Sequence, residues 1–284
     1  MAVLNPARVG AWTEELPWTV DAEQARAYAA ATNDDNPWFT NGRLAPPVYV
    51  VAIAVHVWAP AMERAFAADP YTLGSVHGEQ DLYLHRPLAP GMRLRLRAAV
   101  VGVHPKSTGT LVVGRVEARD DTVLVAEQFF VNFFRGFTVQ QGIGELPPEH
   151  RLPEAVTAQP PLARVRYPVD PDQGIRYAHA SGDRGIYHLD DEAARRLGFP
   201  RKIVHGVCTM AFAGRAVVEV ACGGDPRRLR RLAVRFSAPL LPGQDVTTTL
   251  WPLGERAGRA RVGFQVADQS GLVVISNGLA EVAS

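Results

Sequence analysis

The sequence contains an internal repeat that covers most of its length. The segment YAAATNDDNPWF, residues 28–39, aligns without gaps on YAHASGDRGIYH, residues 177–188, with a constant offset of 149 positions. A second pair, HRPLAPG at 85–91 and SAPLLPG at 237–243, is offset by 152 positions, and strand-like runs follow both copies. Repetition on this scale predicts two similar structural units. The 284 residues, 47% of them hydrophobic, are enough to bury a core in each unit.

Each copy is expected to begin with helices and to end with strands. Asp21 is placed to cap a helix that runs to about Ala31, and Asp170-Pro171 is placed to start its counterpart, which ends near Gly182. Asp190 or Asp191 caps a short helix that Gly198 stops. Longer apolar helices are predicted at 49–67 and 207–221. Enrichment in β-branched and aromatic residues with partial alternation predicts strands at 75–83, 93–103, 110–118, 123–134, 231–238, 246–252, 259–267 and 272–282.

The helix predicted at 207–221 is apolar almost all round, so we expect other elements to enclose it. A curled antiparallel sheet is the available partner, which is the hotdog arrangement. The predicted fold class is therefore α+β, a double hotdog in which each half is an antiparallel sheet wrapped around a long helix. The expected domains are residues 1–139, a proline-rich linker at 140–161, and residues 162–284.

Composition narrows the class of partner. The formal net charge is +1, with 30 basic and 29 acidic residues, so no global field recruits nucleic acid or an anionic membrane. No apolar run of 18 residues occurs, and no secretory signal pattern is present, so we expect a soluble cytoplasmic protein without membrane insertion. Cys208 and Cys222 are expected to be buried, unpaired thiols.

The stretch from Tyr177 to Gly206 carries the candidate chemistry. Asp183 and His188 lie five positions apart on a connection between helical segments, where both can reach one water molecule or one substrate carbon. Such a pair suits general acid/base catalysis, and adding or removing water at a double bond is one reaction that it could serve. Gly206 opens the long apolar helix, so its N–H lacks an intrahelical acceptor and could stabilise the enolate-like charge of a thioester.

The segments SGDRGIYHLD and KIVHG resemble the signature of the MaoC-like (R)-specific enoyl-CoA hydratases and 3-hydroxyacyl thioester dehydratases. The repeat extends the resemblance to the two-domain members of that family. The resemblance implies that Asp183 and His188 form the catalytic dyad and that the Gly206 N–H is the oxyanion donor. It also implies that the first domain shapes the acyl pocket and has lost the catalytic pair.

Two departures from the family signature stand out. Gly185-Ile186 replaces the usual Asn-Pro, and Lys202 replaces a proline, which removes a rigid turn and an amide that could orient the dyad. The first copy keeps Asp34 and Asn36-Pro37 but has Phe39 where His188 stands, so we expect it to be catalytically silent.

Other polar residues have simpler interpretations. We expect His205 to support the start of the helix rather than to act as a second base. His77 and His85 lack a carboxylate or cysteine at ligand spacing, so no metal site is predicted. The cluster containing Arg227, Arg228 and Arg230 could meet a phosphate of coenzyme A or an acidic carrier protein, and a solvated basic turn is an equal alternative.

The resemblance implies a hydro-lyase that interconverts trans-2-enoyl and (R)-3-hydroxyacyl thioesters without a metal or redox cofactor. The expected partner is an acyl-CoA or acyl carrier protein substrate, and a homodimer is expected by analogy. Two alternatives stay open at this point: a non-catalytic acyl-thioester-binding hotdog subunit, and a specialised dehydratase or cyclase of a biosynthetic pathway. The assignment of acid and base within the dyad is open as well.

Overall fold

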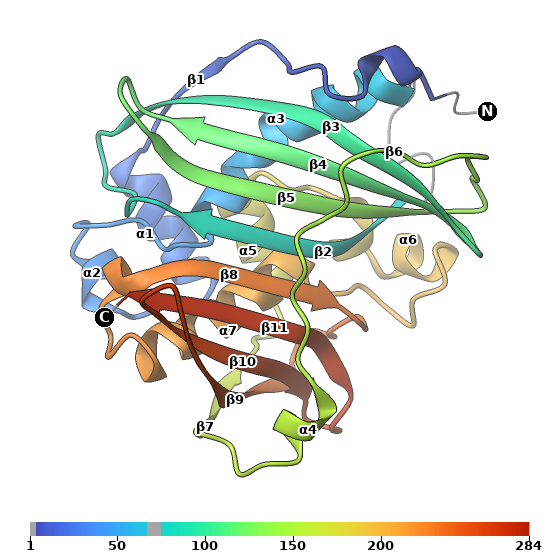
Figure 1. The fold of residues 1–284 in the computed structure, drawn as a ribbon. Helices are drawn as coiled ribbons and strands as arrows, with labels where there is room; N and C mark the ends of the chain where they lie inside the picture. The colour runs from blue at the N-terminus through green and yellow to red at the C-terminus, as the bar shows by residue number, and fades with distance from the viewer. Residues whose placement is uncertain (1–3, 67–74, 284) are drawn as a thin grey trace. The chain divides into compact units, whose positions relative to one another are not determined.

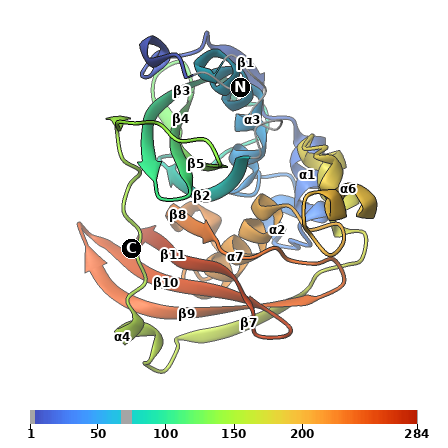
Figure 2. The ribbon, with the colours of Figure 1, turned by 90° about the vertical axis from the view of Figure 1, so that its right-hand side faces the viewer.

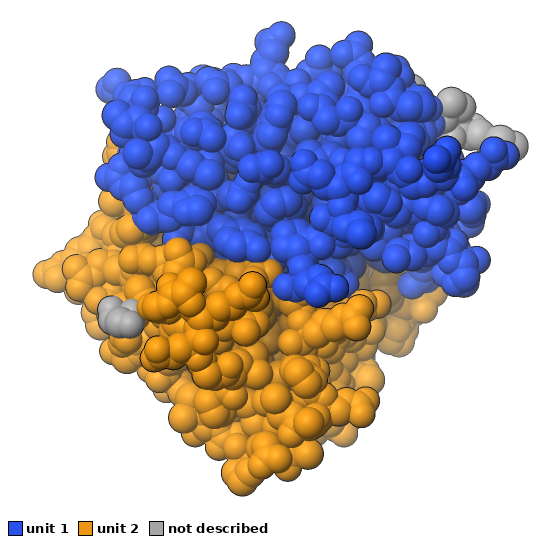
Figure 3. Space-filling model, in the orientation of Figure 1, with its two compact units in different colours: residues 1–19, 53–86, 92–149 blue, residues 20–52, 87–91, 150–284 orange. Residues whose placement is uncertain are grey.

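The computed structural model describes residues 4–66 and 75–283. Their contacts group them into two compact units (Figure 3). Unit 1 comprises residues 1–19, 53–86 and 92–149, and unit 2 comprises residues 20–52, 87–91 and 150–284. The units therefore do not follow the sequence repeat, because segments of the first copy pack with the second. The predicted domain boundaries at 139 and 161 follow the repeat itself and stay a prediction.

Unit 1 contains an antiparallel sheet with the strand order β1-β3-β4-β5-β2, and β6 pairs with β3. A short 3-10 helix, η1 (Pro6–Arg8), precedes the sheet. The strands are β1 (Leu16–Thr19), β2 (Ser75–Leu84), β3 (Arg93–Lys106), β4 (Gly109–Arg119), β5 (Leu124–Arg135) and β6 (Ile143–Gly144).

Helix α3 spans Tyr49–Phe66, and the part of the helix that belongs to unit 1 packs on this sheet (Figure 1). The ring of Trp58 stacks on Phe130 with centroids 5.6 Å apart, and Phe66 stacks on Phe134 at 5.2 Å. A Cβ at Gly114 would lie 2.2 Å from the Trp58 ring, so a glycine is required for this close approach. Aromatic packing thus fixes the helix to the sheet.

Unit 2 repeats the same sheet. Its strand order is β8-β11-β10-β9-β7, which matches β2-β5-β4-β3-β1 strand for strand under the repeat. The strands are β7 (Ala163–Pro168), β8 (Leu229–Phe236), β9 (Asp245–Arg256), β10 (Arg259–Asp268) and β11 (Val273–Ala283). Two sheets of identical order, each with a long helix, confirm the predicted double hotdog.

The helices of unit 2 come from both copies. They are α1 (Ala22–Ala31), α2 (Pro37–Thr40), α4 (Glu154–Thr157), α5 (Gln173–Ser181), α6 (Asp191–Arg196) and α7 (Gly206–Val220), with 3-10 turns η3 (Ile186–His188) and η4 (Pro226–Arg228). The sheet curves around α7, which contacts β7, β8, β9 and β11 (Figure 2). Ten of its residues between Cys208 and Val218 are buried, as an all-round apolar helix requires.

Most predicted elements are confirmed within a few residues. Asp21 caps α1 by accepting from the N–H groups of Glu23 and Gln24, and Asp190 caps α6. The predicted helix end at Ala67 lies outside the described residues. The edge strands β1 and β7 escaped prediction because they are short and only partly buried. The segment predicted as a linker holds β6 and α4.

Two further expectations concern the thiols and the membrane. Cys208 and Cys222 are both free and buried, as predicted. Among the described residues, no helix combines the length and the apolar character needed to cross a membrane.

Candidate active site

The turn that follows α5 carries both dyad residues. Helix α5 ends at Gly182, whose φ of +79° is the left-handed C-cap conformation that glycine adopts without strain. The N–H of Asp183 then donates to Oγ of Ser181 at 3.2 Å. Oδ1 of Asp183 accepts the N–H of Gly185 at 3.1 Å, and the N–H of His188 donates to the Gly185 carbonyl at 2.9 Å. These bonds hold the Asp183 carboxylate on the same turn as the His188 ring.

His188 is buried, with 5% of its surface exposed. Its Nδ1 lies 2.9 Å from the main-chain oxygen of Ile203. Because a carbonyl can only accept, Nδ1 carries the hydrogen, and in the neutral ring Nε2 is left as a proton acceptor. Burial lowers the pKa of His188, and the nearby Asp183 partly opposes this shift. The ring is therefore held neutral and ready to accept a proton.

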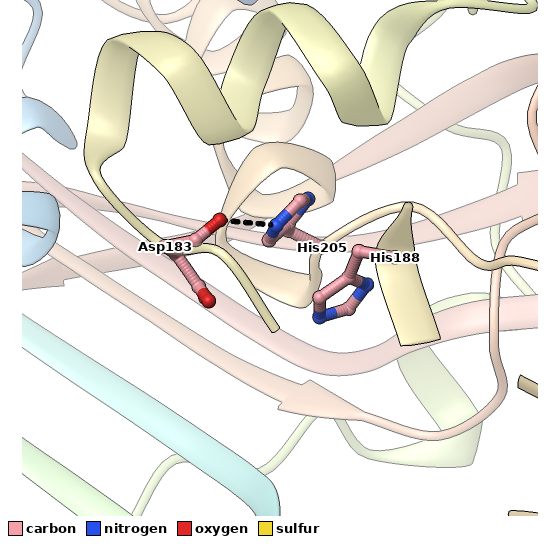
Figure 4. Close-up of side chains that lie close together, drawn as sticks. All are labelled: Asp183, His188 and His205. Carbon is pink, nitrogen blue, oxygen red and sulfur yellow. Dashed lines mark hydrogen bonds between the residues drawn. The ribbon is translucent and has the colours of Figure 1, made fainter. Parts of the chain in front are cut away.

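His205 lies directly against this pair (Figure 4). Its ring stacks on the ring of His188, with centroids 3.7 Å apart and 24° between the planes. Its Nε2 donates to the main-chain oxygen of Asp183 at 3.1 Å. Burial first, and the neighbouring His188 second, lower the pKa of His205 to about 3. His205 is therefore neutral near pH 7.

The three side chains converge. One polar side-chain atom from each residue lies within 4.8 Å of the other two, in the set Asp183, His188 and His205. Two groups at this separation can both hydrogen-bond one water molecule at ordinary donor–acceptor distances. A metal ion would suit the residue types, but Nδ1 of His188 and Nε2 of His205 already bond carbonyls.

Gly206 is the first residue of α7, directly after His205. The His205 carbonyl accepts the N–H of Thr209 at 3.0 Å and so starts the helix. No hydrogen-bond acceptor for the Gly206 N–H is found among the described residues. The unpaired N–H and the positive end of the helix dipole suit a substrate carbonyl oxygen. A Cβ at Gly206 would lie 3.2 Å from the Phe236 ring, which leaves little room for a side chain.

The first copy forms the same turn with a different sequence. The N–H of Asn36 donates to Oδ1 of Asp34 at 3.1 Å, and the N–H of Phe39 donates to the Asn36 carbonyl at 2.9 Å. Both bonds match those made by Gly185 and His188 in the second copy. Replacing Asn-Pro by Gly-Ile therefore keeps these two bonds. It removes the bond from the Trp38 N–H to Oδ1 of Asn36 at 3.0 Å, because Gly185 has no side chain to accept it.

The first copy lacks the other groups of the site. Phe39 is fully buried against Ala29 and Leu44. Asp34 lines a pocket of about 410 Å³ with Trp38 and Arg215, and burial raises the pKa of Asp34 to about 6. This copy keeps a carboxylate without the base that would share a proton with it.

The helix start of the first copy can be matched through the main chain. The N–H of Ala45 donates to the Leu88 carbonyl at 2.9 Å, and that of Val204 donates to the Leu240 carbonyl at 2.8 Å. Leu88 and Leu240 are counterparts in the repeat, so Ala45 matches Val204. Pro46 then stands where His205 stands, and Pro47 stands where Gly206 stands. A proline has no N–H, so the counterpart of the oxyanion donor is missing.

The predicted phosphate contacts lie elsewhere. Arg227 pairs with Asp225 at 2.7 Å and lies 4.4 Å from the centroid of the Trp38 ring. Arg228 donates to the Ala283 carbonyl at 2.9 Å, and Arg230 donates to the Arg227 carbonyl at 2.6 Å. All three follow the C-terminal end of α7, roughly 20 Å from its start at a rise of about 1.5 Å per residue. The structure does not bring them to the dyad, and their role in phosphate binding stays a prediction.

Two features of the site were not predicted from the sequence. The first is the Ile203 carbonyl that selects the tautomer of His188, and the second is the stacking of His205 on His188. The sequence signal for both is the segment IVHG, which brings a carbonyl and a ring to the dyad from 15 to 22 positions away.

Comparison with known proteins relates the chain to families of dehydratases. Residues 154–272 match the family model described as MaoC like domain, and residues 7–127 match that of the FAS1-like dehydratase domain region. The chain is 29% identical over 290 residues to 3-hydroxyacyl-thioester dehydratase Y of Mycobacterium tuberculosis, with 98% of each chain covered. It is 32% identical over 206 residues to the peroxisomal multifunctional enzyme type 2 of Mus musculus, of which it covers 27%.

Solved structures agree with these sequence matches. A MaoC-like dehydratase from Phytophthora Capsici superposes with a TM-score of 0.83 at 27% identity, and 99% of both chains is covered. A Mycobacterium tuberculosis protein described as having a double hotdog fold superposes with a TM-score of 0.63 at 16% identity, which bears on the fold alone.

Fold and site together define a double-hotdog protein of the hydro-lyase class. More specifically, the chain combines a MaoC-like domain with a FAS1-like dehydratase region, and it is similar along almost its whole length to a MaoC-like dehydratase, as the sequence motifs predicted. It is therefore an enzyme of the hydratase and dehydratase type.

Proposed function

We propose that this protein catalyses the reversible hydration of trans-2-enoyl thioesters to (R)-3-hydroxyacyl thioesters. The carrying observation is that Asp183 and His188 share one turn and converge with His205 within 4.8 Å. Gly206 follows His205, and its N–H has no acceptor in the part of the chain that the structure describes. The names of the relatives, a 3-hydroxyacyl-thioester dehydratase and an enoyl-CoA hydratase 2, support the choice of an acyl thioester substrate.

In the hydration direction, Nε2 of His188 removes a proton from the water held by the dyad. The oxygen of that water bonds to the β-carbon, and the electron pair of the double bond moves toward the thioester carbonyl. The Gly206 N–H stabilises the resulting enolate oxygen. His188 passes the proton taken from the water to the Asp183 carboxylate, which delivers it to the α-carbon. This transfer returns both dyad residues to their starting state, and dehydration follows the same steps in reverse.

This assignment is motivated by the tautomer of His188. Its Nδ1–H is committed to the Ile203 carbonyl, so only Nε2 can accept a proton from water. The buried, neutral ring suits a base, because burial lowers its pKa and so keeps Nε2 unprotonated near pH 7. Asp183, with Oδ1 bonded to Gly185, is left with its second oxygen for the substrate and the water.

The proposal requires neither a metal ion nor a redox cofactor, because the reaction transfers only protons and water. Coenzyme A or an acyl carrier protein would carry the acyl group. A homodimer and a cytoplasmic location stay predictions from the sequence and its resemblance.

The experiment is a hydration assay with crotonyl-CoA, longer trans-2-enoyl-CoA and the matching carrier-protein thioesters. We expect loss of the conjugated enoyl-thioester absorbance, and chiral chromatography of the product should give the (R)-3-hydroxyacyl form. An (S) product would refute the stereochemical assignment. Binding of enoyl thioesters without turnover would favour the acyl-binding subunit instead. Turnover restricted to one cyclisable substrate would favour a specialised biosynthetic enzyme.

A further inference from the structure

We propose that His205 is a positioning residue of the active site, which holds the main chain of Asp183 and the ring of His188 in their reactive arrangement. This inference rests on the proposed function and deepens it. It concerns a residue that touches both members of the dyad but that needs no proton transfer of its own.

The contacts of His205 reach both dyad residues at once. Its Nε2–H bonds the main-chain oxygen of Asp183 at 3.1 Å, and its ring covers the ring of His188 at 3.7 Å between centroids. Asp183 lies on the connection between α5 and η3, and His188 is the last residue of η3, so no single helix or strand ladder contains both side chains. His205 is 1% exposed and is the N-cap residue of α7, so its contacts tie this turn to the start of the helix.

His205 is suited to this role as a neutral ring. The titratable groups around it are His188, Asp183 and Tyr177, whose ring centroid lies 4.8 Å away. The ring of Tyr187 packs against the ring of His188, with the two ring centroids 4.2 Å apart. A neutral imidazole presents an electron-rich face to His188, and that face is attractive when His188 takes up a proton.

A polar atom of His205 is left without a partner. Its Nδ1 is buried and makes no hydrogen bond within the described part of the chain. A buried acceptor without a donor costs free energy, whereas an apolar ring of similar shape would avoid that cost. Retaining a histidine here is therefore poorly explained by packing alone and is better explained by the bond that Nε2 makes.

The first copy of the repeat forms this part of the fold without the catalytic residues. It forms the same turn and starts the long helix α3 with Pro46 at the position of His205. The N–H of Tyr49 bonds the Pro46 carbonyl three residues back, whereas that of Thr209 bonds the His205 carbonyl four residues back. The fold can thus begin this helix without a histidine. The first copy has Phe39 in place of the base His188, and it also has no histidine at the position of His205. This pairing links His205 to the reaction rather than to the start of the helix.

The test uses two variants that each keep one contact. In His205→Gln, the side-chain amide can replace the Nε2–H donor, but no ring covers His188. In His205→Phe, the ring remains but the bond to Asp183 is lost. His179→Gln is the matched control, because His179 is an exposed histidine on the neighbouring helix α5. Thermal melting first establishes which variants are folded, and kcat and KM are then measured for enoyl-CoA hydration across pH.

We expect both variants to lose about tenfold or more in kcat, with KM changed less than about threefold, and His179→Gln to match the wild type. In His205→Gln, water admitted beside His188 should raise the pH at which activity falls on the acid side, whereas His205→Phe should not raise it. Wild-type kcat with an unchanged pH profile in a folded variant would overturn the positioning role.

Histidine ¹⁵N NMR of the unmodified protein provides a measurement that needs no variant. His205 should carry its proton on Nε2 and show no titration between pH 5 and 9. A proton on Nδ1, or titration in this range, would overturn the proposal even if both variants fail to fold. An inactive wild type would refute the proposed function, whereas an active wild type with these contrary results would refute only the role of His205.

Discussion

The N–H of Gly185 donates to Oδ1 of Asp183 at 3.1 Å, just as the N–H of Asn36 donates to Oδ1 of Asp34 in the first copy. A Cβ added at Gly185 would lie 3.1 Å from Cδ2 of His188 and 3.4 Å from Oδ1 of Asp183. We therefore predict that Gly185→Ala displaces the dyad by a few tenths of an ångström and lowers kcat by roughly 3- to 30-fold. Steady-state kinetics on a folded variant would measure this effect, and unchanged kcat would contradict the crowding.

The neighbouring position provides the control for that substitution. Ile186 is exposed and begins η3, and its counterpart in the first copy is Pro37. The preceding Gly185 has an extended ψ of 116°, which proline favours in the residue before it. Ile186→Pro should therefore keep kcat within about twofold of the wild type. A large loss would mean that the isoleucine itself contributes to the site.

The proposed oxyanion donor can be removed by a substitution that leaves no cavity. Gly206→Pro deletes the N–H, and proline is tolerated at the first position of a helix. The first copy has Pro47 at this position. We predict a loss of about 10²–10³ in kcat relative to Gly206→Ala, which adds the same Cβ against the Phe236 ring but keeps the N–H. Equal kcat in a folded variant would exclude this N–H from catalysis.

The pH dependence follows from the environment of His188. Burial lowers its pKa, and Asp183 opposes the shift without cancelling it. The base must be unprotonated, so a lowered pKa extends activity toward acid pH. We predict that kcat/KM falls on the acid side with an apparent pKa below the ordinary value of about 6.5. A midpoint at or above 6.5 would contradict the assignment of His188 as a buried neutral base.

The buried carboxylate of Asp34 should destabilise the folded protein above its pKa. Its folded pKa is raised to about 6 by burial, so the folded state binds more protons than the unfolded chain between about pH 4 and 6, and stability falls as pH rises through that window. We predict that Asp34→Asn increases the free energy of unfolding by about 1–3 kcal/mol above pH 7, with little gain near pH 4. Urea unfolding at both pH values would measure this. An equal gain at both would refute the pKa origin.

Much of the fold was predictable because the pattern that encodes it occurs twice. The strands and the apolar helices follow hydrophobic periodicity, and each copy independently supports the other. The edge strands β1 and β7 gave little signal, since they are short and alternate between partial burial and exposure. The grouping of residues 20–52 with the second copy depends on long-range packing. One example is the contact between the rings of Tyr28 and Tyr177, whose centroids lie 5.6 Å apart. Periodicity contains no information about such contacts.

The site was predictable as a set of residues but not as an arrangement. Asp183, His188 and Gly206 could be named because they stand at motif positions on one short stretch. The tautomer of His188 depends on the Ile203 carbonyl, and the stacking of His205 depends on how α7 meets the turn. The consequence of losing Asn-Pro could not be judged from the sequence either. Two main-chain bonds of the turn survive the change, whereas the bond from the Trp38 N–H to the Asn36 side chain has no counterpart at Gly185.

The most direct test compares the two copies of the repeat by equivalent substitutions. Enoyl-CoA hydration is measured for the wild type, Asp183→Asn, His188→Gln and Asp34→Asn, all verified as folded. We predict that the two dyad variants lose a factor of about 10²–10⁴ in kcat, whereas Asp34→Asn stays within about twofold of the wild type. Equal rates for the wild type and both dyad variants would contradict the assignment of Asp183 and His188 as the catalytic dyad.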